Sequence, residues 1–144
     1  MEMSPQEYQE YVKQKSPKSP LVKDTAFAFV IGGAICALGQ LIQNGYVSLG
    51  MERVDAGTAT SVTLIALSAL LTGLNLYNSL ARYAGAGTLV PITGFANAVV
   101  SPAIDFKSEG FVTGMAAKMF TVAGPVIVFG TLSSAVYGVV LMLM

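Results

Sequence analysis

The sequence predicts an all-α integral membrane protein with three full transmembrane helices and a Gly/Pro-rich third segment that is discontinuous or re-entrant. Of its 144 residues, 53% are hydrophobic and 11% are charged, whereas about 25% are charged in a typical soluble domain. Half of the eight basic and eight acidic side chains lie within positions 1–24. The rest of the chain holds four uncharged windows, 25–51, 56–81, 83–104 and 119–144. Each exceeds the roughly 20 residues that a helix needs to cross a bilayer.

The same composition excludes several classes of function. Basic and acidic side chains balance, so there is no excess of positive charge to bind nucleic-acid phosphates. The chain has no His and a single cysteine, Cys36, which excludes a His- or multi-Cys-ligated zinc site and any Ser-His or Cys-His nucleophile. We therefore expect no enzyme activity, no bound metal and no cofactor.

Positions 1–24 are predicted to form a polar cytosolic segment rather than a cleavable signal peptide. Residues 3–15 are polar enough to form a short helix on the membrane surface, and KSPKSP (15–20) is typical of a flexible stretch. Four Lys precede the first apolar window. Because positive residues concentrate on the cytosolic side of membrane proteins, they predict a cytosolic N-terminus.

Residues 25–144 are predicted to form the transmembrane helical domain. Full spans are expected at about 26–48, 57–81 and 119–143, where apolar residues run almost without interruption. Intramembrane amides occur near the end of the first span, at Gln40, Gln43 and Asn44. Pro125 is expected to kink the last helix and to separate residues 110–120 from the span proper.

The third window differs from the others because its segment 84–104 contains three Gly and two Pro. These residues predict a helix broken near Pro91 and Gly94. Irregular backbone at membrane depth is tolerated where protein or a wet cavity surrounds it. The re-entrant arrangement keeps Arg82, Lys107 and Lys118 on the cytosolic side; the alternative is a fourth span.

A polar stripe is predicted along the second span. Its members are spaced three, four or seven residues apart, which places them on one helical face that ends at Arg82: Ser61, Ser68, Thr72, Asn75 and Ser79. Two interpretations fit this pattern. The stripe either lines a pore or packs against another helix, since small hydroxyl residues allow close approach and hydrogen bonding between membrane helices.

A small-residue face is predicted on the last span. Gly130, Ser134 and Gly138 recur every four residues, a pattern typical of close contact between membrane helices. We interpret this face as a packing surface, and we expect the protein to be an oligomer.

Four sequence runs resemble a known family. They are AFVIGGAICALGQ (28–40), AGAGTLVPITGFANAVVSPAIDFKSEGF (84–111), AAKMFTVAGPVIVFG (116–130) and the KSPKSP extension. Together they resemble the family of stage V sporulation membrane proteins that includes the proteins AC and AEb. The resemblance covers nearly all of the chain after Lys13. Tyr83 departs from it, since Phe is expected there.

The resemblance implies a protein of the inner forespore and spore membrane of endospore-forming bacteria. It implies a channel or channel subunit that moves pyridine-2,6-dicarboxylate (dipicolinate), with calcium, during sporulation and germination. It also implies other proteins of the stage V sporulation A operon as partners. The alternative is a non-conducting structural subunit of the same complex.

On the matched motif positions we place a hypothetical substrate path. The N-termini of broken helices present free N–H groups to anions, Gly lets the backbone approach a ligand, and two cations add charge. The path comprises Arg82, Gly85, Gly87, Thr88, Pro91, Thr93, Gly94, Asn97 and Lys118.

Overall fold

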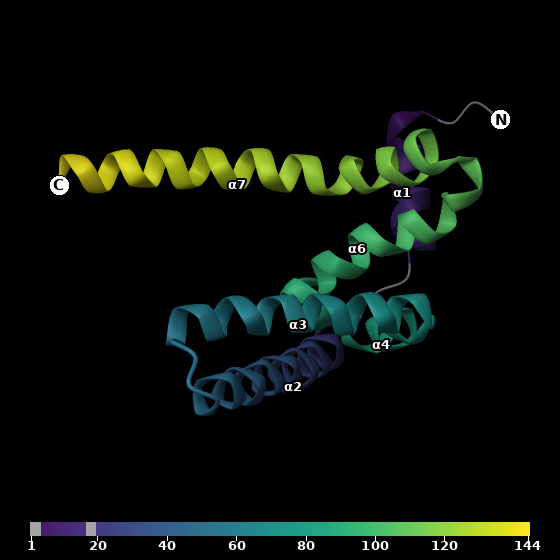
Figure 1. Ribbon diagram of the computed structural model, residues 1–144. Coiled ribbons are helices and arrows are strands. Elements are labelled where there is room, and N and C mark those ends of the chain that lie inside the picture. Colours follow the sequence, from purple (N-terminus) through teal and green to yellow (C-terminus); the bar gives the residue numbers. More distant parts are fainter. Residues whose placement is uncertain (1–3, 17–19) are drawn as a thin grey trace.

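The structure is a computed structural model that describes residues 4–16 and 20–144. Most of these residues are helical and none lies in a β-strand, as the predicted fold class requires. Helices α2 and α3 form a packed pair, a broken hairpin of α4, α5 and α6 lies against that pair, and α7 extends away from it (Figure 1). The KSPKSP extension falls partly outside the described residues.

Helix α1 (Pro5–Lys15) is the predicted short polar helix, and a capping box begins it. The Ser4 backbone N–H and side-chain hydroxyl both donate to the Glu7 carboxylate, each at 2.9 Å. These hydrogen bonds, the backbone one first, lower the pKa of Glu7 below its ordinary value of 4.5. The cap therefore stabilises α1 fully above this ordinary value, and the contribution is lost as pH falls through the lower pKa of the folded state.

Helices α2 (Leu21–Ser48) and α3 (Arg53–Gly73) form the packed pair. Helix α2 covers the predicted span 26–48 and begins before it, at Leu21. A hydrogen bond of 2.8 Å joins the Tyr46 and Thr63 hydroxyls between the two helices. At the turn between them, Gly50 adopts a left-handed φ of 93° that L-residues rarely take.

The predicted continuous span 57–81 is wrong, because α3 ends at Gly73 and α4 (Leu76–Ala84) begins a separate helix. The break lies at Asn75, which has φ 58° and ψ 18°. Asn is among the few residues with a side chain that tolerate this left-handed conformation. The chain changes direction there, so the polar stripe does not continue on one helical face from Ser61 to Arg82.

The third window is discontinuous, as predicted. Helix α5 (Ala86–Leu89) is separated from α4 at Gly85 and from α6 (Ile92–Asp105) at Pro91. Gly85 has a φ of 49°, which suits glycine. The break predicted near Pro91 and Gly94 falls at Pro91. Gly94 itself lies in the first turn of α6, where its lack of a side chain allows close backbone packing.

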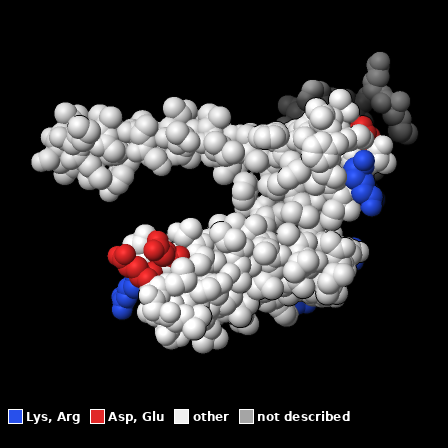
Figure 2. Space-filling view, viewed as in Figure 1, with Lys and Arg blue, Asp and Glu red and all other residues white. Residues whose placement is uncertain are grey.

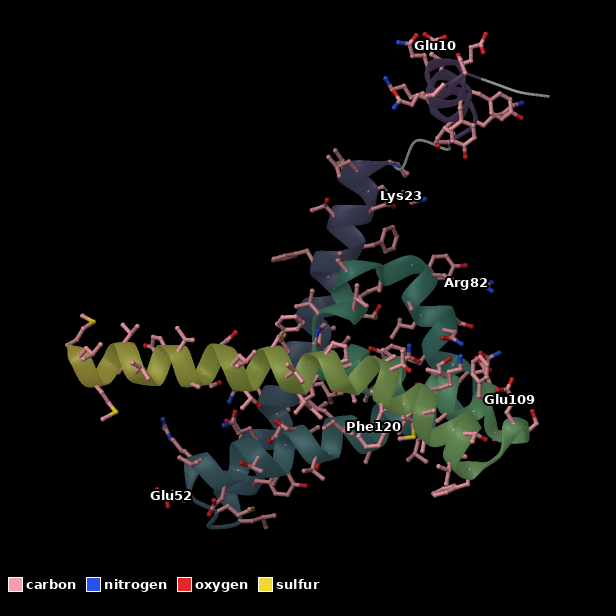
Figure 3. The ribbon with its side chains drawn as sticks, turned by 90° about the horizontal axis from the view of Figure 1, so that it is seen from above. Glu10, Lys23, Glu52, Arg82, Glu109 and Phe120 are labelled. Atoms are coloured by element: carbon pink, nitrogen blue, oxygen red, sulfur yellow. The ribbon has the colours of Figure 1, made fainter. Side chains whose placement is uncertain are left out.

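The direction of α6 shows that the broken segment returns to the side from which it started. Ser68 of α3 bonds to Thr93 of α6. Thr72, four residues further along α3, bonds to Asn97, four residues further along α6. The two helices therefore run in the same direction where they touch. Since α3 and α6 are locally parallel and Thr93 bonds to Ser68, the chain must run back between the end of α3 and the start of α6. Figure 3 agrees, with Arg82 and Glu109 toward one end of the molecule and Glu52 toward the other. This is the re-entrant arrangement.

Helix α7 (Ala117–Leu143) follows a 3-10 turn, η1 (Lys107–Glu109), and a π-helical turn, η2 (Phe111–Ala116). Pro125 lies inside α7 without ending it, so the predicted separation of residues 110–120 by Pro125 is wrong. The helical geometry changes at η2 instead, where the Met115 N–H donates to the Gly110 carbonyl in a π-helical step. Membrane helices tolerate an internal proline because neighbouring helices, hydroxyl side chains or local changes of helical geometry can satisfy the backbone groups that it frees.

Three helical stretches in the described chain are long and apolar enough to cross a membrane: Leu21–Ser48, Arg53–Gly73 and Phe111–Leu143. None of the apolar window is buried in the first or the last of them, as expected for helices whose solvent is lipid. In Figure 2 the arm formed by α7 shows no charged side chain beyond its start, and charges gather at the ends of the molecule. These features define the chain as an integral membrane protein.

Candidate functional site

Hydroxyl and amide side chains fill the interface between α3 and α6, where the hairpin packs against the spanning pair. Ser68, only 1% exposed, donates its hydroxyl to the Thr93 carbonyl at 2.6 Å. The Thr72 hydroxyl lies 2.8 Å from Asn97 Oδ1 and 2.7 Å from the Ser68 carbonyl. These two members of the polar stripe therefore pack between helices, and they bring Thr93 and Asn97 of the predicted path with them.

Tyr77 joins all three pieces of the hairpin, a role that no sequence pattern indicated. It lies on α4, is 3% exposed, and donates its hydroxyl to the Thr88 carbonyl of α5 at 2.8 Å. The same oxygen lies 3.0 Å from the Thr93 hydroxyl of α6. One phenol thus connects α4 to both later helices in a buried position, where polar groups left without partners are costly.

Two glycines of the predicted path allow close backbone contact. A Cβ on Gly87 would collide with the Ala28 carbonyl of α2, and a Cβ on Gly94 would collide with the Thr88 and Leu89 carbonyls. Gly32 of α2 faces the same contact, since its Cβ would lie 3.2 Å from Gly87 Cα. Thr88 is 2% exposed and donates its hydroxyl to the Gly85 carbonyl at 3.0 Å. Gly87 and Gly32 therefore allow α5 to pack against α2, and Gly94 allows α6 to pack against α5.

The remaining members of the stripe do not share this interior. The Ser61 hydroxyl donates to the Gly57 carbonyl of its own helix at 3.1 Å. Asn75 accepts from the Asn78 amide at 3.0 Å on the exposed side of the break. Ser79 is exposed on α4. The stripe is therefore divided between a packed interface and an exposed turn.

Arg82 lines a cleft between the start of α2 and the junction of α4 with α5. The cleft has a volume of about 390 Å³, within the range of small-molecule sites. Its lining residues are Asp24, Thr25, Ala28, Arg82, Tyr83, Gly85 and Ala86. Figure 3 shows Arg82 projecting outward from the hairpin, with Lys23 on the neighbouring start of α2. Of the predicted path, Arg82 and Gly85 meet in this cleft.

Lys118 is not brought to the cleft that Arg82 lines. Its ammonium group lies 4.3 Å from the centroid of the Phe106 ring, a cation–π contact that fastens α7 to the end of α6. Pro91 is half-buried at the start of α6. The predicted path is thus dispersed over an exposed cleft, a buried interior and a separate aromatic contact.

The amides of α2 line a second polar cleft at the opposite end of the α2–α3 pair. It has a volume of about 330 Å³, and Gln40, Gln43, Asn44, Val47 and Arg53 line it. Gln40 donates to Asn44 Oδ1 at 2.9 Å. The intramembrane amides therefore lie beside a charged side chain at the end of the helix pair.

The small-residue face of α7 meets no other helix within one copy of the described chain. A Cβ on Gly130 or Gly138 would find no atom within 4 Å, and Ser134 between them is exposed. The contacts of α7 are with α6 and η2. The packing interpretation of this face consequently refers to a second molecule, and it stays a prediction.

The chain is an all-α membrane protein whose re-entrant hairpin packs through hydroxyl side chains against α3 and through glycines against α2, with a cleft that holds Asp24 and Arg82 beside it. Residues 24–140 match the SpoVAC/SpoVAEB sporulation membrane protein family. The chain is 46% identical over 134 residues to stage V sporulation protein AC of Bacillus subtilis (strain 168), covering 92% of this chain and 89% of that protein. It belongs to the SpoVAC/SpoVAEB family. No solved structure matches it.

Proposed function

We propose that this protein is a membrane channel, or a channel subunit, that moves dipicolinate with calcium across the inner forespore and spore membrane during sporulation and germination. The proposal assigns it no catalytic step. It rests on membership of a sporulation membrane protein family and on one observation in the site. A guanidinium, Arg82, lines a cleft beside the broken third segment, and guanidinium is the side-chain group best shaped to bind carboxylates.

The cleft offers several groups that suit a flat aromatic dianion. The planar guanidinium fork of Arg82 binds a carboxylate through two parallel hydrogen bonds. The adjacent Tyr83 ring, 72% exposed, provides an apolar face for an aromatic ring. Gly85 brings the backbone to the cleft without a side chain. A dianion at the cytosolic end of the hairpin would meet these groups first.

The path through the membrane is proposed to require more than one molecule. The buried hydroxyls of Ser68, Thr72 and Tyr77 are engaged with neighbouring helices, and the outer half of α7 is exposed. We therefore propose that several copies, or other proteins of the stage V sporulation A operon, assemble in the lipid bilayer around a shared path.

Substitution of Arg82 tests this function in spores. Arg82→Lys keeps the charge but loses the planar fork, and Arg82→Gln loses both. Both variants should insert normally yet accumulate and release dipicolinate poorly, with Gln the more severe. Arg53→Gln, at the opposite end of the helix pair, is the matched control. Wild-type dipicolinate content in Arg82→Gln spores would remove Arg82 from the path and leave Lys118 and the backbone of 91–97 as candidates.

One observation favours a second candidate, a structural subunit that conducts nothing itself. Ser68 and Thr72 bond to α6 rather than face an open path. A protein whose polar stripe serves packing is well suited to hold partners in place. Dipicolinate release from liposomes that contain the purified chain supports the channel, and silence without partners supports the structural subunit.

A further inference from the structure

We infer that the polar cleft at the turn between α2 and α3 binds the headgroup of a phospholipid, with Arg53 holding the phosphate and the amides of α2 holding the glycerol esters. This cleft lies at the opposite end of the helix pair from Arg82 and shares no lining residue with the proposed solute path. Its volume of about 330 Å³ falls within the range of small-molecule sites.

The amides of the cleft form one row along α2. Gln40, Gln43 and Asn44 are spaced by three and four residues, which places them on one helical face. Gln43 extends from this row toward α3, since its Nε2 lies 3.6 Å from the position of a Cβ on Gly57. Gln40 donates to Asn44 Oδ1 at 2.9 Å, so Asn44 uses its oxygen within the row and presents its N–H groups to a ligand. The row therefore offers amide donors beside the guanidinium of Arg53.

The charge of the cleft favours an anionic group. Arg53 contributes a positive charge, and none of the described residues that line the cleft is acidic, so a bound cation would meet repulsion without a carboxylate to offset it. A guanidinium donates to phosphate oxygens through two parallel hydrogen bonds. Glu52 and Asp55 flank Arg53 in the chain, so a phosphate followed by an ammonium group, as in phosphatidylethanolamine, suits both signs of charge at this end of the molecule.

The depth of the cleft is that of phospholipid headgroups. Helix α2 has 28 residues, which at about 1.5 Å per residue is longer than the roughly 30 Å of hydrocarbon that it crosses. Its last turn therefore extends beyond the hydrocarbon, and Arg53 begins α3 at the same level. Gln43 and Asn44, one turn deeper, lie at the level of the glycerol esters, whose carbonyl oxygens accept hydrogen bonds from amides.

Apolar side chains beside the cleft distinguish a lipid from a water-soluble phosphate. Leu41 follows Gln40 on α2 and is 69% exposed, and Val54 follows Arg53 on α3 and is 74% exposed. Val47 lines the cleft itself. A soluble phosphate leaves these surfaces uncovered, whereas the acyl chains of a bound phospholipid cover them.

Three probes added to the purified, delipidated full chain in detergent test the phospholipid site. Dioleoylphosphatidylethanolamine has both headgroup and chains, dioleoylglycerol has the chains alone, and phosphoethanolamine has the headgroup alone. Binding is measured by native mass spectrometry and by the rise of the midpoint of thermal unfolding. Wild type should bind the phospholipid about tenfold more tightly than either of the other probes. Arg53→Gln should weaken phospholipid binding about tenfold, since a hydrogen bond to a charged group is lost, and Asn44→Leu severalfold.

Two further variants serve as controls. Arg53→Lys keeps the charge without the planar fork and should retain part of the affinity. Lys107→Gln removes an exposed cation from η1, at the other end of the molecule, and should bind like wild type. Arg53 and Asn44 are exposed, so their variants should keep the wild-type midpoint without added probe, which separates loss of lipid from loss of folding.

Three results would overturn the phospholipid site. They are unchanged phospholipid affinity in Arg53→Gln, binding of dioleoylglycerol as tight as that of the phospholipid, and binding of phosphoethanolamine as tight as that of the phospholipid. The last result would assign the cleft to a soluble anion. None of the three bears on dipicolinate transport, because Arg53→Gln spores are expected to keep wild-type dipicolinate content whether or not the cleft binds lipid.

Discussion

Replacing Tyr77 by Phe removes a single buried oxygen and tests whether the hairpin is held together as described. The oxygen donates to the Thr88 carbonyl at 2.8 Å and lies 3.0 Å from the Thr93 hydroxyl. Thr88 is 2% exposed, so its carbonyl loses this donor in a site closed to water. Leaving a buried acceptor without a partner costs about 1–3 kcal/mol, whereas interhelical hydrogen bonds in membranes average about 0.6 kcal/mol.

We expect Tyr77→Phe to destabilise the chain by about 2 kcal/mol, the middle of the buried-acceptor range. At about 2–4 °C per kcal/mol for a chain near this length, the midpoint of thermal unfolding in detergent should fall by about 4–8 °C. Tyr83→Phe removes the same atom from a residue that is 72% exposed, and its midpoint should stay at that of wild type. Equal midpoints for the two variants would refute the role of Tyr77.

Three other perturbations test packing, assembly and topology. Gly87→Ala forces a methyl group into the Ala28 backbone and should lower the yield of folded protein severalfold. Gly33→Ala, whose methyl group meets no atom within 4 Å, should express normally. Equal yields of the two variants would contradict the close contact between Gly87 and Ala28. Gly130→Leu should weaken oligomers seen by crosslinking, by separating helices that meet at small residues, and unchanged crosslinking would mean that this face contacts lipid. In a chain without Cys36, a cysteine near Lys15 should be labelled from the cytosolic side and one added after Met144 from the opposite side. If both cysteines are labelled from the same side, the third segment crosses the membrane fully.

The spanning helices could be predicted because lipid imposes a simple requirement on them. A helix that crosses the bilayer needs a long uncharged run, whatever it packs against. Such runs occur at 26–48 and 119–143, and α2 and α7 cover them. The discontinuous third segment followed from equally local properties, since Pro91 cannot continue a preceding helix and glycine permits the φ of Gly85. The π-helical turn at 111–116 had no comparable signal.

The helix break at Asn75 was not predicted, because the uncharged window 56–81 was interpreted as one continuous span. Gly73 and Asn75 are residues that commonly end helices, yet they lie within an uncharged window that is long enough to be one span. Apolar composition indicates that a segment enters the bilayer, but it does not require one straight helix. The conformation of Asn75 is a local choice that hydropathy does not report.

The candidate site could be predicted only in part because its contacts join distant segments. Arg82 was identified by its position before the Gly-rich break, a local feature, and it does line a cleft. Asp24 lines the same cleft from the start of α2. The rest of α2 and the whole of α3 lie between the two residues in the chain, and no sequence pattern links them. Tyr77 likewise acquires its role from hydrogen bonds to residues 11 and 16 positions away, which depend on how the hairpin closes.

Release of dipicolinate from liposomes tests the central claim most directly. Vesicles loaded with calcium dipicolinate and containing the purified full chain would be compared with protein-free vesicles and with vesicles containing Arg82→Gln, with release followed by terbium luminescence outside. The account predicts release by wild type well above the protein-free rate, and a severalfold slower release by Arg82→Gln. Release no faster than from protein-free vesicles would contradict conduction by this chain and leave the structural subunit as its function.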